Sequence, residues 1–463
     1  MTFLYRLAWR LARPLAAPLA LTGGKLGKAL RGRRGAVPAL SGWAERSRDP
    51  TRPLVWFHAA SVGEGRQAEA VLLRLRAARP SWQVVYTFSS PSAERWAASL
   101  PVDFAGYVPF DTVGDTGAAL DAVRPTAIVF SATDIWPELV RQAAARRVAL
   151  GVVSATMAPT SSRRGAAARG FLASAYGSLT RVGTIDDADA RALERTGVPH
   201  ARITITGDTR HDAAHARVAA LRTDAPLLRA LKGDGRDRRP IVVAGSTWPK
   251  DERVLMPALR TAHRKGAAFR LVIAPHEPTA EHLHALEAKL DYCMPAGMRR
   301  VRLSSLLATG NREPLPPGNL PSGNLGAPGN LDAPGGWDVV VVDRVGVLAE
   351  LYAAAAVAFV GGGFHGRGLH SVIEPAAAGV PVLFGPRWQG SRDARLLLAA
   401  GAALAARDRA ELSAGLARWL QDETARATAA AAARAVVEHG QGAADRSLQL
   451  VIDLVEQSLA PGP

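Results

Sequence analysis

Short apolar runs alternate with amphipathic stretches along most of the chain, a pattern that predicts parallel strands joined by helices. In the first half we expect strands at residues 54–60, 83–90, 127–132, 148–155, 181–185 and 203–208. The pattern restarts after a charged, glycine-bearing stretch at 232–239, with strands expected at 241–247, 269–276, 338–344, 357–363, 381–386 and 402–408. This repetition predicts an α/β protein with two Rossmann-like, doubly wound parallel-sheet domains that face each other across a cleft.

The domain boundaries follow from the same pattern. We expect an acceptor domain at residues 51–225, a donor domain at 236–445 and a C-terminal helix and tail at 446–463. The stretch from about 410 to 459 is rich in Ala, Arg, Leu and Glu and is predicted to be helical, with a return to the first domain as one option. Residues 316–336 repeat Gly-Asn-Leu between prolines and glycines, which predicts a disordered surface insertion without chemistry.

Residues 1–50 form a basic, amphipathic amino-terminal segment. Its apolar positions recur at roughly helical spacing, at Phe3, Leu4, Leu7, Leu11 and Leu15. The longest stretch without charge, 14–24, is shorter than the roughly 20 apolar residues that span a bilayer. Basic residues follow at once, and this order favours a helix lying in an anionic membrane interface. A helix docked on the body of the protein and a cleaved signal peptide remain as alternatives.

The net charge of the chain limits the classes of molecule that it is expected to bind. The chain has 57 Lys and Arg against 41 Asp and Glu, a net charge of +16, which favours nucleic acid, anionic lipid or anionic substrates. The sequence has no zinc-finger spacing or RNP-like aromatic motif, so we expect no nucleic-acid partner. With one cysteine, Cys293, neither an intramolecular disulfide nor a cysteine-built zinc site can form.

Three polar residues in the first domain follow predicted strands. Glu64 lies in HAASVGEG (58–65), where it is either a general base or only compensates the helix dipole. Asp134 lies in FSATDIWPEL (130–139), where it either faces the cleft or caps the next helix. Arg210 lies in ITITGDTRHD (203–212), where it either meets developing negative charge or is a solvated surface arginine.

The second domain has two candidate anion sites. In VVAGSTWPKDE (242–252), Ser246 or Thr247 is expected to cap a helix whose free N–H groups attract an anion. In the motif at 357–386, three consecutive glycines would let the backbone approach a phosphate, namely Gly361, Gly362 and Gly363. Ser371 and Glu374 there have capping-box spacing, an alternative that leaves the glycines unexplained.

The motifs occur in the order HAASVGEG, ATDIWPEL, TGDTRHD, AGSTWPKDE, APHEP and DRVGVLAELYAAAAVAFVGGGFHGRGLHSVIEPAAAGVPVLFGP, after a basic apolar amino terminus. Together they resemble the 3-deoxy-D-manno-octulosonic acid (Kdo) transferases of lipid A biosynthesis, which have the GT-B fold. The resemblance covers nearly the whole chain except 316–336. It implies Glu64 as catalytic base, with Asp134 and Arg210 as transition-state stabilisers. It also implies CMP contacts at Ser246, Pro275, His276, Val345, Gly346, Val347, Ser371, Val372, Ile373 and Glu374, the last holding the ribose.

The resemblance further implies an inverting transfer of Kdo from CMP-Kdo to a lipid A precursor, similar to lipid IVA, without cofactor or metal. The location it implies is the cytoplasmic face of the inner membrane, on an anionic surface. Four positions depart from the usual family residues: Asp134 replaces Glu, Arg210 replaces Lys, Pro275 replaces Arg and Ser371 replaces Asn. Two alternatives stay open, a GT-B enzyme that uses another nucleotide sugar, such as a UDP-sugar transferase or epimerase, and a catalytically silent nucleotide binder at the membrane.

Overall fold

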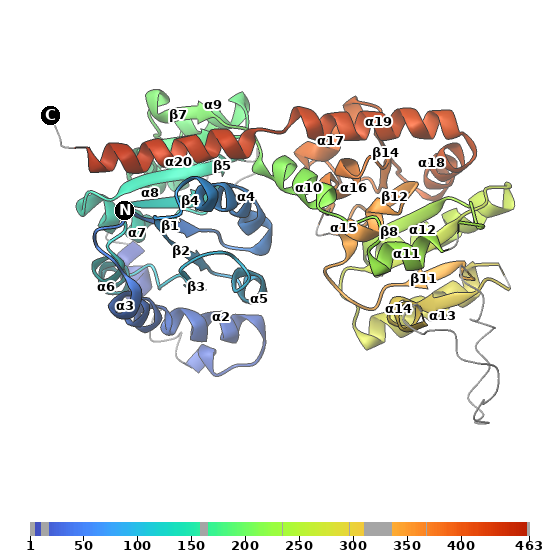
Figure 1. Ribbon diagram of the computed structural model, residues 1–463, viewed down its shortest axis with the longest axis horizontal. Coiled ribbons are helices and arrows are strands. Elements are labelled where there is room, and N and C mark those ends of the chain that lie inside the picture. Colours follow the sequence, from blue (N-terminus) through green and yellow to red (C-terminus); the bar gives the residue numbers. More distant parts are fainter. Residues whose placement is uncertain are drawn as a thin grey trace. The chain divides into compact units, whose positions relative to one another are not determined.

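The computed structural model describes residues 5–10, 18–157, 165–233, 235–295, 297–309, 336–366 and 368–460. The chain divides into two compact units, Met1–Ala213 with Gly440–Pro463, and Ala214–His439 (Figure 1). This division differs at both ends from the expected domains at 51–225 and 236–445. The first break falls inside helix α10, Thr209–Ala219, which runs on across it, and the last helix belongs to the first unit.

The first unit is built on a seven-stranded parallel sheet with the order β3-β2-β1-β4-β5-β6-β7. Its strands are β1 Leu54–His58, β2 Gln83–Phe88, β3 Phe104–Tyr107, β4 Ala127–Ser131, β5 Ala149–Ala155, β6 Arg181–Thr184 and β7 Ile203–Ile205. Its helices are α2 Gly24–Arg34, α3 Ala36–Ser47, α4 Val62–Ala78, α5 Glu94–Ala97, α6 Val113–Val123, α7 Pro137–Ala145, α8 Ala166–Gly177, α9 Asp187–Glu194 and α20 Ala443–Leu459, with short 3₁₀ turns η1 Pro91–Ala93 and η3 His200–Arg202. The predicted doubly wound sheet is confirmed.

The second unit repeats the arrangement with the order β10-β11-β9-β8-β12-β13-β14. Its strands are β8 Ile241–Thr247, β9 Arg270–Pro275, β10 Arg300–Arg302, β11 Val339–Val341, β12 Val357–Val360, β13 Val382–Phe384 and β14 Ala403–Ala405. Its helices are α11 Pro226–Lys232, α12 Pro249–Arg264, α13 Ala280–Cys293, α14 Leu303–Thr309, α15 Leu348–Ala353, α16 Ile373–Ala377, α17 Arg392–Ala399, α18 Arg409–Gln421 and α19 Glu423–His439.

Both faces of each sheet are buried. In β1, Leu54 and Trp56 join one apolar cluster, whereas Val55 and Phe57 join the other. Successive side chains of a strand point to opposite faces, so a sheet covered on both sides needs continuous apolar strands. This explains why its strands read as unbroken apolar runs in the sequence.

The last helix, α20, packs on the first unit against α4 and β5. Asp212 fixes its start by accepting hydrogen bonds from the N–H groups of Gly442 (2.9 Å) and Ala444 (3.0 Å). Arg446 Nε donates to the carbonyl of Thr206 at 2.9 Å. The helical tail and its return to the first domain are therefore confirmed.

Residues 5–10 of the amino-terminal segment are helical and dock on the first unit. Tyr5 donates to Asp111 Oδ2 at 2.5 Å, and Arg6 forms a two-pronged pair with Glu138 at 2.9 and 3.0 Å. The docked-helix alternative is thus correct for these residues. Phe3, Leu4, Leu11, Leu15 and the insertion at 316–335 lie outside the described residues. Within the described chain, no helix has the length and apolar character needed to cross a membrane.

Candidate active site

Two of the three candidate residues of the first unit lie where its strand order reverses. Strands on one side of β1 continue to β2 and β3, and those on the other side begin with β4. Ligands of such sheets bind beyond the carboxyl ends of the strands at this switch point. Glu64 follows β1 and Asp134 follows β4, so the fold brings the two predicted carboxylates to the same place.

Glu64 occupies the first turn of α4, where its Oε2 accepts hydrogen bonds from Ser61 N (3.1 Å) and Ser61 Oγ (3.3 Å). Glu64 therefore has a structural role at the start of α4, where it forms a capping box with Ser61. Burial raises the pKa of Glu64, and the charge of Asp134 raises it further, against the hydrogen bonds from Ser61 and the proximity of His58. A half-buried carboxylate with a raised pKa is suited to accept a proton.

Asp134 does not cap helix α7. That function belongs to Asp111, which accepts hydrogen bonds from the N–H groups of Glu138 (2.9 Å) and Leu139 (2.8 Å). Asp134 Oδ2 instead lies 3.4 Å from His58 Nε2. The turn that presents it begins at Ala132, whose φ of 57° is a left-handed conformation that costs energy for a residue with a Cβ. This strain turns the chain sharply at the end of β4.

His58, at the end of β1, is a residue that the sequence analysis missed. Its Nε2 accepts a hydrogen bond from Trp136 Nε1 at 2.9 Å, so the proton of a neutral ring lies on Nδ1, which is 3.0 Å from Thr87 Oγ1. Thr87 Oγ1 also accepts from Trp56 Nε1 at 2.8 Å. The fully buried imidazole is thereby fixed in one tautomer beside Asp134.

Arg33 belongs to the basic amino-terminal run but lies inside the first unit. Its guanidinium carbon is 4.3 Å from the centre of the Trp136 ring, and its NH2 donates to the Pro109 carbonyl at 2.8 Å. Burial lowers the pKa of Arg33 to about 10, against the charges of Asp111, Tyr5 and Asp134. The residue therefore remains a cation at neutral pH, in the vicinity of Asp134.

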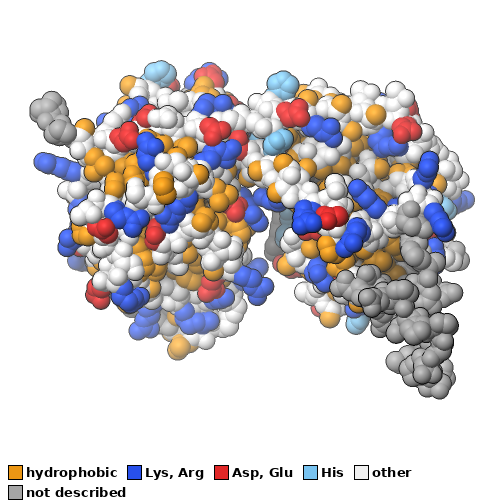
Figure 2. Space-filling view, in the orientation of Figure 1, with side chains coloured by type: hydrophobic (Ala, Val, Ile, Leu, Met, Phe, Trp, Pro, Cys, Tyr) orange, Lys and Arg blue, Asp and Glu red, His pale blue; other side chains and the backbone are white. Residues whose placement is uncertain are grey.

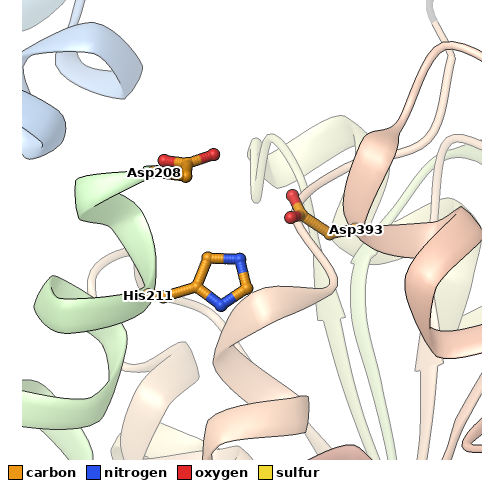
Figure 3. Close-up of side chains that lie close together, drawn as sticks. All are labelled: Asp208, His211 and Asp393. Carbon is orange, nitrogen blue, oxygen red and sulfur yellow. The ribbon is translucent and has the colours of Figure 1, made fainter. Parts of the chain in front are cut away.

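Figure 3 shows the Asp208 side chain at the amino-terminal end of α10. Arg210, in the first turn of this helix, pairs with Asp208. Its Nε lies 3.0 and 3.1 Å from the two carboxylate oxygens. Burial by itself would raise the pKa of Asp208, but the charge and hydrogen bonds of Arg210 hold it below its ordinary value. Asp208 Oδ1 also accepts from Gln67 Nε2 at 3.4 Å, which places this pair beside α4, one turn after Glu64. Arg210 is therefore partly buried and paired with Asp208, so it is not a fully solvated surface arginine.

In the second unit the strand order reverses between β8 and β12. Ser246 and Thr247 end β8, and the three glycines 361–363 follow β12. Ser246 has a φ of 53°, a second strained position at a switch point. A Cβ on Gly361 would lie 2.2 Å from the Ser246 carbonyl oxygen, and one on Gly362 or Gly363 would lie 2.2 or 2.4 Å from backbone of Gly368 or Gly385. All three glycines are required for close packing of the loop.

Asp251 organises this glycine loop. Its buried carboxylate accepts hydrogen bonds from the N–H groups of Gly362 (2.8 Å), Phe364 (3.0 Å) and Trp248 (3.0 Å). Trp248 is the N-cap of α12, so the prediction that Ser246 or Thr247 caps this helix is wrong. Gly361 N donates to the Gly245 carbonyl at 2.9 Å. The N–H groups of Gly361 and Gly362 are thus engaged within the protein, and a phosphate would need other donors.

Four rings stack beside the glycine loop. Trp248 lies 4.6 Å from His365 and 4.7 Å from His276, and His276 lies 4.3 Å from His370, measured between ring centres. Trp248 Nε1 donates to His370 Nε2 at 2.8 Å. Burial, and then the neighbouring His276 and His365, lower the pKa of His370 to about 4, so its ring is neutral at physiological pH. Of these four residues the sequence analysis selected His276 alone.

Glu374 lies in the first turn of α16, and the alternative of a capping box with Ser371 is wrong, because the N-cap is Val372, without a side-chain bond. The Glu374 carboxylate instead accepts a hydrogen bond from Arg217 NH1. The remaining predicted donor residues lie on strand-end loops. Pro275 ends β9, and Val345, Gly346 and Val347 form the turn between β11 and α15, where Val345 is 70% exposed.

Comparison with known proteins finds similarity to one family of enzymes. Residues 30–213 match the family model described as 3-deoxy-D-manno-octulosonic-acid transferase (kdotransferase). A 3-deoxy-D-manno-octulosonic acid transferase of Bordetella pertussis is 28% identical over 427 residues, 90% of this chain and 91% of that one. The corresponding protein of Chlamydophila psittaci is 25% identical over 358 residues, 76% of this chain and 74% of that one. The chain is thus similar to Kdo transferases over most of its length, and these relatives indicate a glycosyltransferase.

Solved structures confirm the fold of this Kdo transferase homologue. A putative UDP-N-acetylglucosamine 2-epimerase from Listeria monocytogenes has a TM-score of 0.57 and 13% identity, covering 88% of this chain and 97% of that one. A glycosyltransferase from Rickettsia africae has a TM-score of 0.55 and 10% identity, covering 89% and 100%. At such identities the likeness shows the GT-B type of architecture and leaves the donor sugar to other observations. The roles assigned to individual site residues stay predictions.

Proposed function

We propose that this protein moves Kdo from CMP-Kdo to a lipid A precursor, with Glu64 as the proton acceptor. The observation that carries the proposal is the pair Glu64 and Asp134 at the β1–β4 switch point, with the pKa of Glu64 raised by burial and by Asp134. Glu64 removes the proton of an acceptor hydroxyl, whose oxygen bonds to the anomeric carbon of Kdo. The bond from that carbon to the CMP phosphate oxygen breaks, CMP leaves with the electron pair and the centre is inverted.

The donor would be held by the second unit. Glu374 would accept hydrogen bonds from the ribose, and the ring stack of Trp248, His276 and His365 lies near the end of β8. Arg210 would compensate charge on the leaving phosphate after turning from Asp208. We expect Glu64 of the first unit and Glu374 of the second unit to act in the same reaction. We also expect this reaction to proceed without a metal.

We also propose that α2 holds the enzyme on an anionic membrane surface at the cytoplasmic face of the inner membrane. Lys25, Lys28, Arg31 and Arg34 are exposed on this helix, and Leu26 is 61% exposed among them. Leu21, in the turn before α2, is 85% exposed. Figure 2 shows Lys and Arg side chains at the end of the first unit where Figure 1 places α2. Apolar side chains within a basic surface suit an interface of anionic lipid.

The transfer assay incubates the purified full-length protein with CMP-Kdo and a lipid A precursor and follows the lipid by mass spectrometry. We expect the lipid to gain Kdo, and Glu64→Ala to lower kcat by at least about 100-fold, as for loss of a general base. Glu69→Ala is the matched control, because this glutamate of the same helix forms a partly exposed pair with Arg66. Full transfer by Glu64→Ala would contradict the assignment of the base. Turnover of a UDP-sugar in place of CMP-Kdo would contradict the donor.

A further inference from the structure

Helix α10 carries two arginines that each pair with an acid. Arg210 pairs with Asp208 in the first unit, and Arg217 pairs with Glu374 in the second. The two arginines are seven residues apart, so they lie on the same face of the helix. The sequence analysis selected Arg210 and Glu374 but not Arg217, whose partner is 157 residues away in the chain.

The Arg217–Glu374 pair is not what holds the fold together at this point. Each side chain is 27% exposed, and an ion pair in contact with solvent contributes little to stability. The turn that carries Glu374 is fixed by its own buried residues, Val372 and Ile373, which belong to the apolar core of the second unit. The pair is therefore available for ligand binding at little structural cost.

The negative charge of the proposed donor explains why Glu374 needs Arg217 as a partner. The proposed donor carries a negative phosphate diester and a negative sugar carboxylate, and Glu374 is the residue expected to contact its ribose. Without a neighbouring cation, the ionised Glu374 would repel this ligand in a partly desolvated site. Arg217 supplies the cation directly at the carboxylate. A guanidinium has five N–H groups, so a bond to Glu374 leaves donors for an anionic ligand.

We infer that Arg217 is a positioning residue of the donor site, which orients the Glu374 carboxylate toward the ribose and cancels its charge so that an anionic sugar nucleotide can bind. The inference rests on the proposed function, because it assumes that the ligand of this site is the anionic nucleotide sugar. It adds a residue to the site and assigns it a role in affinity for the donor, while the chemical step belongs to other groups.

The test is a double-substitution cycle in the full-length protein with four forms: the natural enzyme, Arg217→Gln, Glu374→Gln and the double variant. Calorimetric Kd for CMP and for CMP-Kdo, together with KM and kcat, are measured for each. We expect Arg217→Gln to raise the donor KM by about 10- to 100-fold with kcat changed less than about threefold. In the Glu374→Gln background the same substitution is expected to cost less than about threefold, because the charge that it compensates is gone.

Two further variants separate this role from a structural one. Arg217→Lys retains the charge and is expected to recover most of the lost donor affinity, whereas a need for folding alone would show as a lowered Tm in both Arg217 variants. Arg229→Gln, an exposed arginine on α11 of the same unit, controls for the change in net charge. An unchanged donor KM in Arg217→Gln, or an equal cost in both backgrounds, would overturn the inference. A natural enzyme that binds neither CMP nor CMP-Kdo would instead overturn the proposed function.

Discussion

At the scale of single residues, the reactivity of Glu64 is set by its surroundings. Burial and Asp134 raise its pKa, whereas the hydrogen bonds from Ser61 lower it. A base acts as the carboxylate, so activity falls as the pH drops below its pKa, and the raised pKa puts this acid limb at higher pH than a free glutamate would.

Asp134 raises the pKa of Glu64 and Ser61 lowers it, so we expect substitutions at these two residues to have opposite effects. Asp134→Asn removes the like charge, so we expect the acid limb of the kcat profile to move to lower pH. Ser61→Ala removes the hydroxyl that donates to the carboxylate, so we expect the limb to move to higher pH. The measurement is kcat against pH for the natural enzyme and both variants. Shifts of both variants in the same direction would contradict the assignment of Glu64 as the titrating base.

The site shows which residues a sequence can reveal. Glu64 and Asp134 could be predicted because each directly follows a recognisable strand, and parallel strands end at the same edge of a sheet. Asp251 and Arg217 could not be selected this way, because their partners Gly362 and Glu374 lie 111 and 157 residues away. Their roles depend on contacts that only the folded chain creates.

At the scale of elements, the sequence predicted twelve of the strands, and the two that it missed are β3 and β10. Both lie at the edge of their sheets. All four residues of β3 are half-buried and include Gly106, and β10 has three residues with arginine at both ends, so neither has the run of β-branched residues that marks a central strand. The predicted strand at 357–363 ends earlier, at Val360, because the three glycines turn into the loop.

The backbone of the glycine loop packs so closely that it leaves no room for a side chain at Gly361. Gly361→Ala would place a Cβ 2.2 Å from the carbonyl oxygen of the strained Ser246, so the loop must shift. We expect the free energy of unfolding to fall by about 1–3 kcal/mol and the affinity for CMP to fall with it. Denaturant unfolding and calorimetry measure the two effects. Gly390→Ala is the matched control, since its Cβ would meet no atom within 4 Å, and an equal loss there would contradict the packing argument.

One carboxylate, that of Asp212, fixes the start of α20 on the first unit. Asp212→Ala removes the acceptor for the N–H groups of Gly442 and Ala444, and we expect a loss of about 1–2 kcal/mol in stability. Faster amide exchange confined to α20 would show that the helix is released locally. Glu456→Ala on the same helix removes only an exposed pair with Arg79 and should cost less than about 0.5 kcal/mol. Equal costs would show that Asp212 has no special role.

At the scale of the whole molecule, the surplus of +16 permits two explanations for membrane attraction. Figure 2 shows Lys and Arg side chains on both units, so a diffuse positive field would attract any anionic vesicle. A specific surface on α2 would instead combine a few charges with apolar contact. Leu21 and Leu26 are exposed before and on the helix that carries Lys25 and Arg34, which favours the second explanation, because apolar side chains contribute nothing to a diffuse field.

Vesicle sedimentation separates these explanations. We expect the natural protein to bind vesicles that contain phosphatidylglycerol, to bind phosphatidylcholine vesicles far less, and to lose binding as salt is added. Lys25→Gln with Arg34→Gln should lower the partition coefficient by roughly 30-fold, since each basic residue near an anionic surface is worth about 1 kcal/mol. Leu21→Ser with Leu26→Ser should weaken binding at constant net charge. Arg229→Gln with Arg253→Gln removes the same charge from exposed positions of the second unit, so an equal loss in this control would assign the attraction to net charge and not to α2.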